Sequence, residues 1–451
     1  MTSPLTSPAP VLSNNQLDLL TAASELPDLS AWEFVGPCRL SHNNATWDRK
    51  LTGRWDGIGT GAIDDADRAI CELAKNAEFG VRAPEISAAA LDHSWLIPAV
   101  FVPTWNFLTG RTELQWWEMW HRVSDGVPAA TTLLFQSNPP MCLTERLPIV
   151  PGVAGRSTGE NCLPTRLFGR AAMFRKVTVG DGVALALSYE SEPLDADSTV
   201  SILTVLSLVF GEDINLKAEI VTDVLGLTVS RRLFAGMHDQ CHKEPKPSLD
   251  CRNEETIHAF ASCFEEMVES ARRLRFEQDC PIDAAIVTLL SCNEWRRDRE
   301  IRDIVLALDT VVESDLFTPN DGRIVNDFAP IKADIHAAIG ALPATVPSTL
   351  RTRLCDRVAE ANQTSMSARR SNFWSRVGFD PGSEHETPAL ERRHPMSHKG
   401  FIDVEKIEDE LRLRDDVWLA RTLVNEAFLA LLGYRGPIAD YASGTNRKMR
   451  V

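Results

Sequence analysis

Residues 257–274, IHAFASCFEEMVESARRL, decide how the second half of this chain folds. Apolar residues recur in this stretch at intervals of three and four, the spacing that gathers side chains on one face of an α-helix. Asn253, just ahead of the stretch, is a residue type that caps helix starts. We therefore predict a helix with a core-facing apolar stripe made of Ile257, Phe260, Phe264, Met267, Val268, Ala271 and Leu274.

Further helical patterns follow toward the C-terminal end. Pro281 suits the first turn of a helix that continues through Leu290. A third apolar stripe occupies residues 301–312. Additional helices are expected at 331–342, 348–362, 402–413 and 417–432, with Gly433 ending the last of them. Apolar stripes of this kind typically form the core of a helical bundle.

The first half of the chain has a different pattern. Asp125-Gly126 and Gly180-Asp181-Gly182 each separate two apolar or alternating runs, which favours β-hairpins at 113–136 and 173–189. A third hairpin is expected at 216–231, and an uncharged helix at 198–210 stopped by Gly211. The predicted fold is α+β and multidomain: a disordered tail (1–13), a mixed β-rich N-terminal domain (14–236), a linker (237–253) and an α-helical domain (254–451).

Composition limits the classes of function. The chain has 451 residues, 44% of them hydrophobic, and a formal net charge of −16. A strongly acidic protein is not coated in nonspecific nucleic-acid contacts, so any RNA binding must be local. No apolar run approaches the roughly 20 residues of a membrane span, and the first residues lack a signal-peptide pattern, so we expect a cytoplasmic location and no membrane partner. Phosphate-loop, dinucleotide and nucleophile-elbow motifs are missing.

Most of the ten cysteines lie in apolar helical patterns and are expected to be reduced core residues. One polar stretch departs from this, because His238, Cys241, His242 and Cys251 are residue types that bind zinc. Their spacing matches no standard zinc finger, and an ordinary interdomain linker is the favoured interpretation. Metal binding there remains an open alternative.

The densest group of chemically active residues is Glu391–Gly400, ERRHPMSHKG. Arginine presents a planar fork of donors that fits phosphate oxygens, and histidine exchanges protons near neutral pH. Pro395 favours the first turn of a helix, which places Arg393 and His394 before the helix start and His398 one turn inside it. The free N–H groups at such a start also favour an anion. The stretch therefore predicts a phosphate site.

Arg393 and His394, followed by Pro395-Met396-Ser397 and His398, resemble the Rx4-6H motif of HEPN domains, the helical ribonucleases of bacterial toxin and anti-phage defence systems. Lys399-Gly400 and the late apolar helix ending Leu431-Leu432-Gly433-Tyr434 are similar to the ApeA-like branch. The likeness covers roughly residues 280–440. This chain departs from the pattern in having histidine at the polar position and a proline directly after it.

The resemblance implies a metal-independent endoribonuclease, without a cofactor, that cleaves RNA through attack of the ribose 2′-OH on the adjacent phosphate. His398 would act as acid or base, Arg393 would hold the scissile phosphate, and His394 would orient His398 or carry the second proton. Arg392 and Lys399 would add phosphate contacts. The family pattern further implies a homodimer through the helical domain, RNA (possibly tRNA) as substrate, and an N-terminal domain that responds to a phage-derived trigger.

Each of these assignments has a simpler alternative. Arg393 and His398 can cap a helix and pair with nearby carboxylates, in which case the bundle is a catalytically inactive binding or sensor module. Arg369, Arg370 and Arg376 can guide RNA to the cleft or form a solvated helical face. Trp116, Trp117 and Trp120 can be a stacking platform for bases, although strand and core positions are the commoner use of tryptophan.

Overall fold

The structure is a computed structural model. It describes most of the strands between residues 32 and 122 and, with short gaps inside some ranges, residues 123–146, 161–234, 245–291, 297–317, 324–360, 365–379, 386–391 and 407–450. The predicted N-terminal tail lies outside the described residues except for Ser13, and so do residues 237–244 of the predicted linker.

The chain divides into two compact units. The sheet unit comprises residues 1–245 and 249–268, and the helical unit comprises residues 246–248 and 269–451. The fold is thus mixed, with a large antiparallel sheet and several helices. None of the helices in the described part of the chain is both long and apolar enough to cross a membrane.

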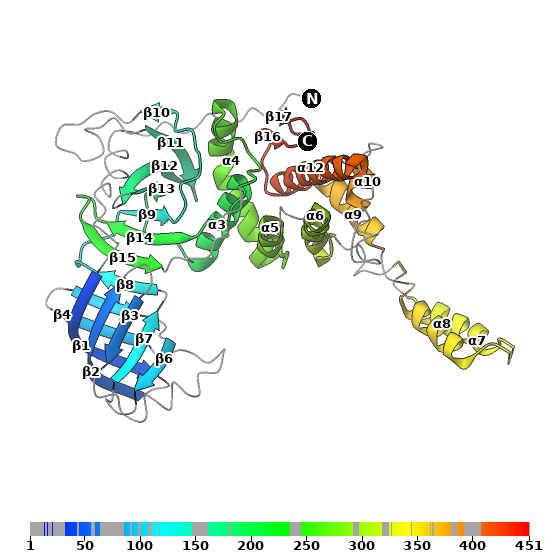
Figure 1. Ribbon diagram of the computed structural model, residues 1–451, viewed down its shortest axis with the longest axis horizontal. Coiled ribbons are helices and arrows are strands. Elements are labelled where there is room, and N and C mark those ends of the chain that lie inside the picture. The colour runs from blue at the N-terminus through cyan, green and yellow to red at the C-terminus, as the bar shows by residue number, and fades with distance from the viewer. Residues whose placement is uncertain are drawn as a thin grey trace. The chain divides into compact units, whose positions relative to one another are not determined.

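Among the residues that the structure describes, the sheet unit contains one fifteen-stranded sheet (Figure 1). Its strands are β1 (Trp32–His42), β2 (Ala45–Trp55), β3 (Gly59–Ile63), β4 (Glu85–Ala90), β5 (His93–Ile97), β6 (Phe101–Asn106), β7 (Arg111–Trp116), β8 (Glu118–Arg122), β9 (Ala130–Phe135), β10 (Glu145–Arg146), β11 (Asn161–Leu167), β12 (Arg170–Val179), β13 (Gly182–Tyr189), β14 (Leu216–Thr222) and β15 (Thr228–Phe234). They lie in the order β10-β11-β12-β13-β9-β14-β15-β8-β5-β4-β1-β2-β3-β7-β6.

Two of the three predicted hairpins are confirmed and one is wrong. β12 and β13 pair in register across the predicted glycine-rich turn, and β14 pairs with β15. β8 and β9, which flank Asp125-Gly126, do not pair with each other: β9 lies between β13 and β14, whereas β8 pairs with β15 and β5. The β14–β15 hairpin is inserted between them, so the Asp-Gly pair belongs to a crossing connection.

Two helices accompany the sheet. α3 (Ala196–Phe210) starts at Asp195, whose carboxylate accepts the N–H of Ser198 at 2.7 Å, and ends at Gly211 with φ 68°, as predicted. α4 (Glu254–Arg272) packs Phe260 and Phe264 against Phe174 of β12, with ring centroids 5.9 and 5.0 Å apart. The stripe at 257–274 is buried throughout, which confirms the predicted core face. Part of it covers the sheet rather than other helices.

The helical unit continues with α5 (Ile282–Leu290), α6 (Arg297–Val312), α7 (Ala329–Gly340), α8 (Ser348–Glu360), α9 (Met366–Val377), α10 (Glu386–Glu391) and α12 (Ile407–Leu431). A π-helical turn (Arg273–Glu277) follows α4, and a 3-10 turn (Asp315–Phe317) follows α6. The residues that form the stripe at 301–312 are fully buried, as expected: Ile301, Ile304, Val305, Leu308, Val311 and Val312. Leu306, in the same range, is exposed. The two helices predicted at 402–413 and 417–432 are wrong, since α12 runs unbroken from Ile407 to Leu431.

A short hairpin of β16 (Pro437–Asp440) and β17 (Thr445–Lys448) follows α12 and was not predicted. Gly433, with φ 93°, ends α12 as the sequence indicated. Ala439 donates its N–H to the Ser248 carbonyl at 3.0 Å, so residues 246–248 belong to this unit through contacts far along the chain.

Candidate functional site

The predicted catalytic and phosphate-binding residues Arg392, Arg393, His394, His398 and Lys399 lie outside the described residues. The segment that carries them, residues 392–406, joins two described helices. These helices, α10 and α12, contact each other, and Ala389 and Leu390 of α10 are buried. Both ends of the segment are therefore attached to one packed pair of helices.

α9 also packs against α12 (Figure 1). It carries the three arginines that the sequence predicted to guide RNA. Ser365 caps α9 by accepting the N–H of Ala368 at 3.2 Å, and Gly378 ends it with φ 91°. Phe373 and Trp374 lie on its inner face with ring centroids 5.0 Å apart, and the Phe373 ring meets Phe317 edge-on at 5.0 Å. This aromatic packing fixes α9 against the end of α6.

The three arginines of α9 all bind groups at the end of α6 or just after it. Arg370 donates Nε and Nη2 to Oδ1 of Asp309, at 2.9 and 2.7 Å, and the Asp309 side chain is 1% exposed. Arg369 donates Nη1 to the Glu313 carbonyl at 3.2 Å, and Arg376 donates to the Leu316 carbonyl. A carboxylate buried to this degree needs a charge-assisted partner. Arg370 therefore supports the fold, whereas Arg376 is exposed and Arg369 half-buried.

A second buried ion cluster joins α6 to α12. Oε1 of Glu300 accepts from Nζ of Lys246 and, at 3.1 Å, from Nη2 of Arg421. The Glu300 and Arg421 side chains are almost fully buried. One turn along α12, Nδ2 of Asn425 is buried without a hydrogen-bond partner among the described residues, and so is Nε of Arg421. Such donors commonly bind an internal water.

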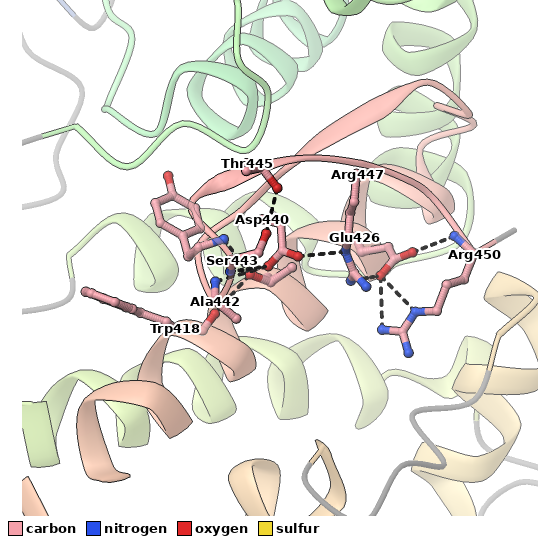
Figure 2. Close-up of polar contacts among 10 residues, drawn as sticks. Trp418, Glu426, Asp440, Ala442, Ser443, Thr445, Arg447 and Arg450 are labelled. Atoms are coloured by element: carbon pink, nitrogen blue, oxygen red, sulfur yellow. Dashed lines mark hydrogen bonds and ion pairs between the residues drawn. The ribbon is translucent and has the colours of Figure 1, made fainter. Parts of the chain in front are cut away.

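A third cluster holds the β16–β17 hairpin onto α12 (Figure 2). Glu426, with 0% exposure, accepts the Arg450 backbone N–H at 2.7 Å, Nε of Arg450 at 3.2 Å and Nη2 of Arg450 at 3.1 Å, and Arg447 donates to the same carboxylate. Asp440 accepts the backbone N–H groups of Ala442 and Ser443 and so shapes the hairpin turn. This cluster was not predicted, although a glutamate inside an apolar helical run is a signal that a cationic partner is needed.

Of the possible zinc ligands, Cys251 alone is described, and His238, Cys241 and His242 lie outside the described residues. Cys251 is buried, and burial together with nearby Asp250 raises the pKa of its thiol. A zinc ligand must be a thiolate, which this environment disfavours. Within the described ranges, no three His, Cys, Asp or Glu side chains are grouped so that they could hold a metal ion.

Comparison with protein-family models, with curated proteins and with solved structures finds no match for this chain. Its function is therefore inferred from its own residues and from the resemblance of the motif at 393–398. In the described part of the helical unit, α10 and α9 each pack against α12, the helix that follows that motif in the chain.

Proposed function

We propose that this chain is a metal-independent endoribonuclease of a toxin or abortive-infection defence system. Arg393 holds the scissile phosphate and stabilises the charge that develops on it, and His398 transfers a proton to or from the reacting ribose or leaving oxygen. His394 orients His398 or carries the second proton. Arg392 and Lys399 contribute further phosphate contacts.

The observation that carries this proposal is the position of the motif between α10 and α12. Catalysis by positioned side chains requires that they stand on elements whose own packing is fixed. The motif is bounded on both sides by helices with buried residues, and α12 also packs against α9. On α9, Arg376 is exposed and Arg369 half-buried, so both retain surface for contacts with RNA.

The assembly and setting belong to the same proposal. RNA is the substrate, with tRNA as one candidate, and two copies pair through the helical unit so that two motifs form one composite cleft. A twofold pair is the commonest assembly of soluble proteins. The sheet unit responds to a phage-derived trigger, and the protein acts in the bacterial cytoplasm.

The test compares cells that express the natural chain with cells that express Arg393→Ala or His398→Ala during phage infection. We expect RNA fragments with 2′,3′-cyclic phosphate ends from the natural chain, and at least about a hundredfold fewer from either variant, since loss of a general acid or a phosphate contact commonly costs that much. Fragments are quantified by sequencing RNA ligated at cyclic phosphate ends.

Arg412→Ala is the matched control, because Arg412 is an exposed arginine at the start of α12 outside the motif. It should cleave like the natural chain at equal soluble expression. If both motif variants protect cells as well as the natural chain and no fragments form, the nuclease proposal is wrong, and the inactive binding module becomes the better account.

A further inference from the structure

α7 and α8 form a helical hairpin that is fixed by its own polar contacts. At its tip, Arg351 donates Nη2 to the carbonyls of Leu342 at 3.1 Å and Pro343 at 2.8 Å, just beyond the end of α7. At its base, Asn362 accepts the N–H of Val325 on Oδ1 and donates Nδ2 to the Val325 carbonyl, both at 2.8 Å. The two helices contact each other, and their short connection makes them antiparallel neighbours (Figure 1).

This hairpin has little core of its own. Every described residue of α7 and α8 is exposed or half-buried. Four large apolar side chains are 36–47% exposed, namely Ile331 and Ile335 on α7 and Leu350 and Leu354 on α8. A helix with an apolar stripe gains stability when the stripe packs against another element, so these four residues mark a surface suited to docking.

The four exposed residues share one face of the hairpin, which we call the α7–α8 face. Each is followed directly by a half-buried residue, as expected where the two helices contact: Lys332, His336, Arg351 and Cys355. One residue corresponds to a rotation of about 100°, so both apolar stripes are displaced from the contact between the helices in the same rotational sense. In antiparallel helices, an equal displacement leads to the same side of the pair.

We propose that the α7–α8 face binds the same face of a second copy of the chain, so that two hairpins form a four-helix bundle. Two layers of two helices bury an apolar stripe on every member. A contact between identical surfaces is self-complementary and closes as a twofold dimer. The inference names the surface for the pairing in the proposed function, and it rests on that proposal only for the consequence that two motifs act together.

Charge favours a second copy as the occupant of this face. The whole chain has a formal net charge of −16, which opposes most contacts between two copies. Residues 329–360 differ from the rest, since they include four Lys or Arg residues and three Asp or Glu residues. Two copies can therefore meet at this hairpin without the repulsion that acts between average parts of the surface.

The size of the face predicts a reversible dimer. α7 has 12 residues and α8 has 13, so each helix is about 18–20 Å long. Packed helices lie about 8–10 Å apart, which makes the face of two helices about 20 Å wide. A surface of about 400 Å² on each copy is smaller than the roughly 800 Å² per partner of a standard interface. We therefore expect the dimer to dissociate at micromolar concentrations.

Sedimentation equilibrium of the purified full-length chain without RNA tests this pairing at concentrations from about 1 to 100 μM. We expect the average mass to rise from 50.0 kDa toward twice that value as the concentration increases. Leu354→Glu should weaken the dimer at least about a hundredfold, because it buries a charge in an apolar contact. Leu306→Glu is the matched control, since Leu306 is an exposed leucine of α6 in the same unit, and it should pair like the natural chain.

Opposite charges then show which surface pairs. A copy with Leu350→Lys and Leu354→Lys and a copy with Leu350→Glu and Leu354→Glu should each stay monomeric, because like charges face each other across the twofold contact. An equal mixture of the two should form a mixed dimer. This recovery requires that both hairpins are folded and that the same face meets in both copies.

Three results overturn the inference: a natural chain that stays monomeric, a dimer that the charge variants leave unchanged, or a mixture that does not pair. A monomeric natural chain leaves a different protein or another part of this chain as the occupant of the face. Because RNA takes no part in the measurement, a chain that pairs through this face but does not cleave RNA contradicts the proposed nuclease alone.

Discussion

Glu426 in the helical unit and Glu219 in the sheet unit are both buried glutamates, with exposed fractions of 0% and 5%. Glu426 accepts hydrogen bonds from Arg447 and Arg450, including a backbone N–H. Glu219 receives none from the described residues, and its nearest cation, Arg232, is hydrogen-bonded to Glu118 instead. A buried carboxylate that the chain itself satisfies serves stability, whereas one that receives no hydrogen bond lowers stability through the cost of its burial.

The largest effect is expected from removing the Glu426 carboxylate, which accepts several hydrogen bonds from the chain itself. Glu426→Ala should lower the free energy of unfolding by about 3 kcal/mol, because two arginines lose their buried partner and the β16–β17 hairpin loses its attachment to α12. Urea unfolding followed by circular dichroism measures the change. The control Glu410→Ala, at an exposed position of the same helix, should stay within about 0.5 kcal/mol of the natural chain. Equal losses in both variants would contradict the structural role of Glu426.

A somewhat smaller effect is expected at the pair between Arg370 and Asp309. Arg370→Ala should lower the free energy of unfolding by about 2 kcal/mol, since Asp309 would remain buried without its two charge-assisted bonds. Thermal and urea unfolding measure this loss, and Arg353→Ala on the exposed part of α8 is the control. Unchanged stability combined with weaker RNA cleavage would instead assign Arg370 to the substrate.

The smallest expected change in the free energy of unfolding is an increase rather than a loss. Glu219→Gln should raise the free energy of unfolding at pH 7 by about 1 kcal/mol, because it removes a buried charge that no donor satisfies. Burial raises the pKa of the Glu219 carboxyl group in the folded state, whereas nearby Arg232 lowers it and Glu118 raises it. The charge of Glu219 also raises the pKa of the Tyr189 hydroxyl group. Stability of the natural chain should therefore fall as pH rises from the unfolded pKa of about 4.3 through the folded one.

Urea unfolding at pH 4 and pH 7 checks this prediction. At pH 4 the glutamate is mostly neutral in both states, and the natural chain and Glu219→Gln should have nearly the same stability. A variant that is less stable than the natural chain at pH 7 would show that Glu219 already has a partner in the ligand-free protein.

Local patterns predicted the local structure well. The apolar stripe at 257–274 is buried because helical spacing alone determines which side chains share a face. Gly211 and Gly433 end their helices because each takes a positive φ that other residues avoid. β12 and β13 pair as predicted because they are adjacent both in the chain and in the sheet.

Long-range pairing was not predictable in the same way. Asp125-Gly126 carries a hairpin signal, but a Cβ at Gly126 would lie 3.1 Å from the Val229 side chain, so this glycine serves a close approach between β15 and the crossing connection. The partners of Glu426 lie 21 and 24 residues further along the chain. Arg232 meets Trp120 across more than a hundred residues, which no local period encodes.

The order of strands has a further consequence, for self-association. Among the described strands, β10 and β6 stand at the two ends of the sheet. β10 is only Glu145 and Arg146, and β6 contains Pro103 within an irregular register against β7. Charged, very short or proline-interrupted edges are poor templates for an incoming strand from another chain. Substituting Pro103 with a β-branched residue would make the edge of β6 more regular. We expect this variant to aggregate more readily than the natural chain.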